Sequence, residues 1–268
     1  MDDPVGTTVD SSPEPLTPSG TTLATLGFLM AAAGPILLIV ASLIFGLDLE
    51  DVTFFLIPSV LGLLGAFLVR RRSTLAKAFA IVCAVLTFMT VFWTVFGLAL
   101  PASFFDFVPG TLVLPGVLLA IGATIASIRA AKRGESTSPG ERRVASVILA
   151  VVGVLALASA ILTVTGRDTV PESAADQADL VVDLEDFEFD QDAYEVPGGG
   201  TVLVKNSDPF VHNFAVDALD IDVDLGPGDE KLVDIPGEPG TYVLYCEPHT
   251  EDSEDPGEDD MAAEITVG

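Results

Sequence analysis

The stretch Tyr242-Val-Leu-Tyr-Cys246-Glu-Pro-His249 decides how the chain is interpreted. It ends in a thiol and an imidazole three residues apart, which a tight loop after a strand can turn toward one ion. The other of the two histidines lies upstream, in Phe210-Val-His212-Asn213-Phe214, and a methionine, Met261, follows shortly after His249. One thiol, two imidazoles and a thioether are the ligands of a mononuclear blue-copper site. His212, Cys246, His249 and Met261 are therefore the candidate metal ligands, and copper is the expected cofactor.

Strand periodicity supports this ligand set, because side chains two residues apart in a strand share one face. The positions that share a face with the candidate ligands are mostly apolar: Phe214 and Val216 with His212, Tyr242 and Leu244 with Cys246, and Ala263, Ile265 and Val267 with Met261. We therefore expect the four ligands at the ends of inward-facing apolar rows, at one pole of a β-sandwich.

The last part of the chain resembles the cupredoxins of the plastocyanin, pseudoazurin and halocyanin type. The matching segments cover about ninety residues, roughly a third of the chain: Val196-Pro-Gly-Gly, Val202-Leu-Val-Lys-Asn206, His212-Asn213-Phe214, Gly226-Pro-Gly228, Pro239-Gly-Thr-Tyr-Val-Leu-Tyr-Cys246, Pro248-His249 and Met261-Ala-Ala-Glu-Ile-Thr-Val267. The resemblance implies an all-β Greek-key sandwich with one type 1 copper site. It also implies that Asn213 hydrogen-bonds near the Cys246 loop. His249 would be the electron port, in an apolar patch with Pro209, Phe210 and Pro248.

The spacing before Met261 departs from the family pattern, which places the axial methionine a few residues after the second histidine. Here residues 250–260 intervene, and seven of them are acidic. The strand pattern after Met261 still matches the closing strand of the family. The alternative is an acidic oxygen or an open axial position, either of which would change the colour and potential of the site.

Charge divides the chain into two parts. Residues 167–268 hold 29 acidic and 3 basic residues, whereas residues 1–166 hold 10 and 9. An acidic surface spread over a whole domain favours a halophilic protein, and we expect a haloarchaeal origin. The negative charge also disfavours a nucleic-acid partner. The alternative for the acidic surface is a docking patch for a basic partner.

Five apolar runs precede the acidic part, each with about the 18–25 residues that cross a bilayer. They are residues 21–47, 52–69, 75–100, 111–130 and 144–165. Basic residues lie between runs two and three (Arg70, Arg71, Arg72) and around the loop between runs four and five. Because basic loops stay cytoplasmic, the N-terminus is expected inside and the C-terminal domain outside the cell membrane.

The expected organisation is a disordered tail over 1–20, a five-helix transmembrane domain over 21–165, a flexible linker over 166–179 and a cupredoxin domain over 180–268. Within the last domain we expect strands at 180–189, 201–206, 213–216, 231–235, 241–246 and 262–267. The membrane part contains no histidine for haem, and Gly62, Gly65, Gly122 and Ala126 are expected to serve helix packing.

The function expected from these observations is that of a membrane-anchored electron carrier. It would work in the lipid bilayer between redox proteins of the respiratory chain, without a small-molecule substrate. An enzyme is disfavoured, because two histidines cannot supply the extra ligands of a multicopper oxidase or copper nitrite reductase. The alternative is extracytoplasmic copper binding and delivery for oxidase assembly, with the acidic insert at 251–260 collecting cations.

Overall fold

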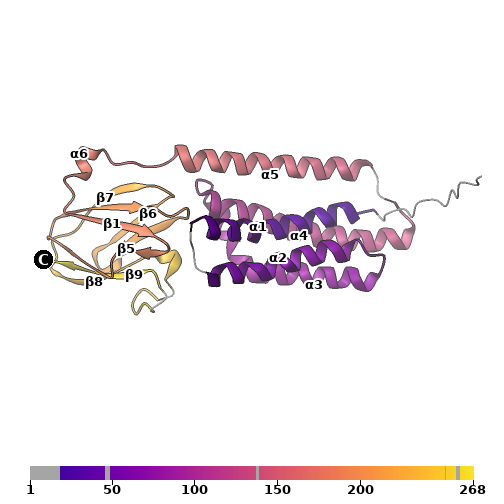
Figure 1. The fold of residues 1–268 in the computed structure, drawn as a ribbon, viewed down its shortest axis with the longest axis horizontal. Coiled ribbons are helices and arrows are strands. Elements are labelled where there is room, and N and C mark those ends of the chain that lie inside the picture. The colour runs from indigo at the N-terminus through magenta and orange to yellow at the C-terminus, as the bar shows by residue number, and fades with distance from the viewer. Residues whose placement is uncertain (1–18, 46–48, 137–138, 251, 258–259) are drawn as a thin grey trace, which may run out of the picture.

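A computed structural model describes residues 19–45, 49–136, 139–250, 252–257 and 260–268 of the chain. Its first part is helical and its last part is a β-sandwich that lies at one end of the helices (Figure 1). The helical elements are α1 Thr21–Phe45, α2 Leu49–Val69, α3 Thr74–Val91, the 3-10 helix η1 Phe92–Ala99, α4 Phe104–Arg133, α5 Pro139–Thr165 and the short α6 Glu172–Ala175. Most of the predicted tail, residues 1–18, lies outside the described residues.

Five helical segments are long and apolar enough to cross a membrane by length and composition, as the apolar runs predicted. Helix α1 packs along α4 and α2, and α2 packs along α3. Helix α5 runs beside this group but contacts it less (Figure 1). Many large apolar side chains of α5 remain exposed, including Val147, Val154 and Leu157. That pattern suits a helix surrounded by hydrocarbon.

Glycines allow the closest helix contacts, as predicted for two of the three glycines. A Cβ atom on Gly62 would lie 2.8 Å from the Ala32 side chain, and one on Gly65 would lie 2.3 Å from the Phe28 ring. The prediction is wrong for Gly122, which has nothing within 4 Å of its Cβ position. Another close contact, missed from sequence, is at Gly27, where a Cβ would lie 2.4 Å from the Ala120 backbone nitrogen.

Helix α4 begins seven residues earlier than its apolar run predicted. Its first turn contains Asp106, and an acidic side chain is favourable there because the helix N-terminus carries partial positive charge. The residue before the helix, Ser103, also donates a hydrogen bond to the Asp106 carboxylate. Residues 104–110, which lie before the predicted apolar run, therefore form the start of the helix.

The sandwich has two sheets, with strand orders β2-β1-β4-β7 and β3-β9-β8-β5-β6. The strands are β1 Leu180–Glu185, β2 Glu188–Phe189, β3 Ala193–Val196, β4 Thr201–Asn206, β5 His212–Val216, β6 Ile221–Leu225, β7 Glu230–Asp234, β8 Gly240–Tyr245 and β9 Ala262–Val267. Inward side chains of both sheets form one core that includes Phe214, Leu244 and Ile265. The predicted combination of five apolar helices and an all-β sandwich is confirmed.

The strand predictions differ from the structure in two ways. Strands β3 and β6 were not predicted, because each is short and contains acidic residues among apolar ones, a pattern that also suits an exposed loop. The predicted strand over 180–189 is broken at Asp186 and Phe187, whose φ angles of 57° and 61° are left-handed. These two residues turn the chain between β1 and β2.

The segment between α5 and the sandwich is hydrogen-bonded to the sandwich. The Asp168 backbone forms two hydrogen bonds with the Asp229–Glu230 turn: its N–H donates to the Asp229 carboxylate and its carbonyl accepts from the Glu230 N–H. At the other end, the Asp179 N–H donates to the Thr201 carbonyl at 2.8 Å. The predicted linker is therefore attached to the sandwich at both Asp168 and Asp179.

Candidate metal centre

Strand pairing brings the candidate ligands to one pole of the sandwich. His212 is the first residue of β5, and Cys246 directly follows the last residue of β8. Because β5 and β8 are antiparallel neighbours, the start of one lies beside the end of the other. His249 ends the 3-10 helix η3 Glu247–His249, which turns the chain back toward His212. The predicted positions at strand ends are thus what the structure shows.

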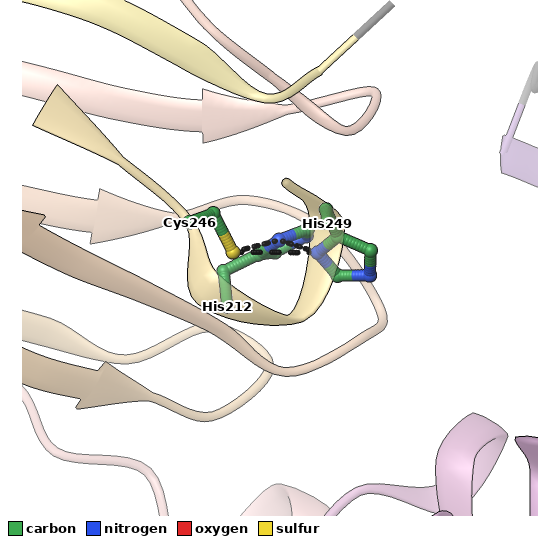
Figure 2. A group of neighbouring side chains, drawn as sticks. All are labelled: His212, Cys246 and His249. Atoms are coloured by element: carbon green, nitrogen blue, oxygen red, sulfur yellow. Dashed lines mark hydrogen bonds between the residues drawn. The ribbon is translucent and has the colours of Figure 1, made fainter. Parts of the chain in front are cut away.

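Three donor atoms form a small triangle (Figure 2). The Sγ atom of Cys246 is 3.5 Å from Nδ1 of His212 and 3.3 Å from Nδ1 of His249, and the two Nδ1 atoms are 3.1 Å apart. The circle through the three atoms has a radius of about 1.9 Å, close to the ~2.0 Å and ~2.3 Å of metal–nitrogen and metal–sulfur bonds. An ion at the centre of the triangle would therefore lie at bonding distance from all three.

Burial sets the protonation of these donors in the metal-free protein. Desolvation raises the pKa of the Cys246 thiol to about 12, although N–H groups of Asn213 and His249 oppose the shift. Desolvation, together with the neighbouring His212, lowers the pKa of His249 to about 3. The His249 ring is thus neutral near pH 7, as metal binding requires, whereas the thiol must lose its proton to a metal.

Asn213 fixes the loop that carries Cys246. Its backbone N–H points to the Cys246 sulfur at 3.4 Å, and its side-chain oxygen accepts a hydrogen bond from the Glu247 N–H at 2.7 Å. Its side-chain nitrogen donates to Asp222 on the adjacent strand β6 at 2.8 Å. The hydrogen bond near the Cys246 loop that the resemblance implied for Asn213 is confirmed.

Asp208 orients His212 from behind, and sequence reasoning missed it. One of its carboxylate oxygens lies 2.8 Å from Nε2 of His212, the ring nitrogen that points away from the donor triangle. The same carboxylate accepts the backbone N–H groups of Asp186 and Phe187, both at 2.9 Å. Burial raises the pKa of Asp208, but these hydrogen bonds outweigh burial and hold it below its ordinary value. An ionised carboxylate therefore fixes the His212 ring.

Phe187 covers the two imidazoles. Its ring centroid is 4.9 Å from that of His249 and 5.4 Å from that of His212, with edge-to-face geometry in both pairs. The left-handed turn that Asp208 holds is what places this ring over the site. The position of Asp208, four residues before His212, could have indicated its contact with that ring. Nothing in the sequence indicated its contact with the backbone of Phe187.

Met261 lies next to the donor triangle despite the long insert. Its backbone N–H donates to the His249 carbonyl at 3.1 Å, and its carbonyl accepts from the Cys246 N–H at 3.0 Å. Its side chain is 2 % exposed and belongs to the sandwich core together with Cys246. The acidic insert thus begins and ends beside the donor triangle, so its extra length does not move Met261 away from His249 and Cys246. Residues 251, 258 and 259 of the insert lie outside the described residues.

Comparison with known proteins agrees with this site. A sequence profile described as "Cupredoxin-like domain" matches residues 148–254. A chloroplast plastocyanin of Oryza sativa subsp. indica is 32 % identical over 126 residues, which are 42 % of this chain and 82 % of the relative. The chain belongs to the cupredoxin family. A plastocyanin of Vicia faba is 35 % identical to this cupredoxin over 74 residues, covering 23 % of the chain and 75 % of the relative.

Solved structures match about a third of this cupredoxin. A purple cupredoxin from Nitrosopumilus maritimus matches 34 % of the chain over its own full length, with 20 % identity and a TM-score of 0.27. An oxidised amicyanin variant matches 35 % of the chain and 89 % of its own length, with 22 % identity and a TM-score of 0.28. The family's cofactor is one copper ion, and the cluster of His212, Cys246 and His249 fits a type 1 site.

Proposed function

We propose that this cupredoxin is a membrane-anchored electron-transfer protein whose copper is held by His212, Cys246 and His249, with Met261 as the axial ligand. The triangle of one sulfur and two Nδ1 atoms carries the proposal, because its size suits a single ion bound by all three. A copper ion in this donor set supplies a one-electron couple. With no substrate of its own, the protein would exchange electrons with other redox proteins.

The surrounding residues support this role by keeping the donors in place. Asp208 holds the His212 ring, Asn213 holds the Cys246 loop, and Phe187 covers both imidazoles. Electron transfer is fast when little moves between the two oxidation states, so a pre-organised and buried donor set favours it. His249 remains partly exposed and Pro248 is exposed, which supports His249 as the place where electrons enter and leave.

We further propose that the five helices span a membrane and that the sandwich lies on its extracytoplasmic side. The connection between α2 and α3, which carries Arg70, Arg71 and Arg72, lies at the end of the helices away from the sandwich (Figure 1). Basic residues favour the cytoplasmic side. The proposed division is a tail at 1–20, a transmembrane domain at 21–165, a linker at 166–179 and the cupredoxin domain at 180–268.

The acidic surface supports a finer assignment to the halocyanin type, from a haloarchaeal source. Acidic groups keep a protein soluble in concentrated salt, where their mutual repulsion is screened. The redox partners proposed for such a protein are membrane complexes of the respiratory chain. The five helices would confine the copper site to the membrane surface, close to such complexes.

The test is to load the full-length protein with Cu(II) in detergent micelles and record its visible absorption and EPR spectra. An intense blue band with a narrow copper hyperfine splitting is expected, and Cys246→Ser should lack the band because it removes the thiolate. A weakly coloured complex in the parent protein would contradict electron transfer and favour copper delivery. Met261→Leu, recorded beside it, tests the axial assignment.

A further inference from the structure

The face of the sandwich around the metal centre packs against the helices. We call Phe187, Phe210 and Val211 the copper-pole face, and Leu38, Ala41, Phe55 and Phe105 the socket. Phe210 is only 8 % exposed and clusters with Leu38 and Ala41, and the rings of Phe55, Phe105 and Phe187 pack against this cluster. The side chain that the sequence suggested for an exposed apolar patch is therefore covered by the chain's own helices.

A hydrogen bond joins the same two surfaces. The backbone N–H of Val211, adjacent to His212, donates to the Asp106 carboxylate at 3.0 Å. Asp106 lies in the first turn of α4 and also accepts a hydrogen bond from Ser103. A partly buried N–H without a partner is costly. The Asp106 carboxylate therefore satisfies a group that the copper-pole face presents beside the metal centre.

Aromatic rings continue this contact to the metal centre. The Phe105 ring centroid is 6.1 Å from that of Phe210, which is 5.1 Å from that of Phe187. Phe187 in turn lies 4.9 Å from the His249 ring. A large apolar ring on the surface of a domain marks an interaction site. Here the socket covers the Phe210 ring, and Asp106 accepts the hydrogen bond beside it.

We propose that the helical domain is the docking partner of the copper-pole face, with Phe210 as the anchor and Asp106 as the hydrogen-bond acceptor. Where it concerns electron transfer, this inference rests on the proposed function. In the docked protein, Phe210 is not available to a soluble redox partner. Electrons then pass through the rim that stays open, which consists of His249 and Pro248.

The single tryptophan of the chain provides a test in the full-length protein. Trp93 lies in η1, with its ring centroid 6.1 Å from that of the socket residue Phe55. Oxidised copper accepts an electron and thereby quenches a nearby excited indole, whereas reduced copper is a much poorer acceptor. We expect Trp93 emission to increase when ascorbate reduces the copper-loaded protein in detergent micelles.

Variants on the helical side separate docking from metal binding, because they are far from the ligands in sequence. Phe105→Ala and Asp106→Ala should keep the blue band and lose most of the redox-dependent change in Trp93 emission. Asp106→Asn keeps an oxygen acceptor and should retain that change. Phe79→Ala, a matched control on α3 whose ring is 57 % exposed, should behave like the parent.

Two results would overturn the inference. One is a parent protein with a blue band whose Trp93 emission does not depend on the copper oxidation state. The other is an unchanged redox response in both Phe105→Ala and Asp106→Ala. The absence of a blue band in the parent would instead refute the proposed function. The two failures are therefore distinguishable in one sample.

Discussion

Replacing Asp208 with asparagine should raise the reduction potential of the metal centre while preserving its fold. The carboxylate is 4 % exposed and lies 2.8 Å from Nε2 of His212. Its lowered pKa keeps it ionised at neutral pH, so it stabilises the more positive, oxidised state of the site. Asparagine has nearly the same shape, and its oxygen can still accept one of the two backbone N–H groups of the Asp186–Phe187 turn.

The size of the effect follows from Coulomb's law. The 2.8 Å contact, the width of the imidazole ring and the radius of the donor triangle together place the carboxylate about 7 Å from the triangle's centre. At an effective dielectric constant of about 20, one charge at that distance contributes about 2.4 kcal/mol. For a one-electron couple this corresponds to a potential about 100 mV higher in Asp208→Asn.

The assay is a spectroelectrochemical titration of the blue band in the parent, in Asp208→Asn and in Asp220→Asn. Asp220 is exposed and follows the far end of β5, so its replacement removes one charge away from the site. We expect a small shift for this control. If Asp208→Asn shifts the potential no more than Asp220→Asn does, or lowers it, the role assigned to the carboxylate is wrong.

Three further predictions concern the ligands and the helices. Because burial raises the pKa of Cys246 to about 12, copper binding must release its proton, and apparent affinity in competition titrations should rise about tenfold per pH unit between about pH 7 and 9. In the metal-free protein the pKa of His249 is lowered to about 3, so acid unfolding followed by circular dichroism should show stability falling by about 1.4 kcal/mol per unit from about pH 6.5 downward. Gly27→Ala should destabilise the α1–α4 contact by about 1–3 kcal/mol in thermal unfolding, whereas Gly122→Ala, which meets open space, should not.

Much of the architecture could be predicted because its signals are local. Long apolar runs predict membrane-type helices, and alternation predicts the faces of β5, β8 and β9. The candidate ligands were found from their chemical types, since the chain has only two histidines and one cysteine outside the apolar runs. Their convergence followed from placing each of them at a strand end.

The parts that could not be predicted depend on contacts between distant segments. Asp208 looks like one more acidic residue in an acidic domain until the fold places it behind His212. The break at Asp186 and Phe187 has the same origin, because the carboxylate that holds this turn comes from the loop between β4 and β5. The packing of Phe210 against the helices joins residues more than a hundred positions apart, which no local pattern encodes.

The contact between the helices and the sandwich has a consequence for the response to ionic strength. Among the described residues, no ion pair joins the helices within 19–165 to the sandwich within 180–268. Their contact is made by apolar side chains and a carboxylate-to-backbone hydrogen bond. At 1 M salt the Debye length is about 3 Å, which weakens exposed ion pairs. Apolar contacts are instead strengthened by salts that are excluded from protein surfaces. The two domains should therefore stay together in brines that would separate an interface built on opposite charges.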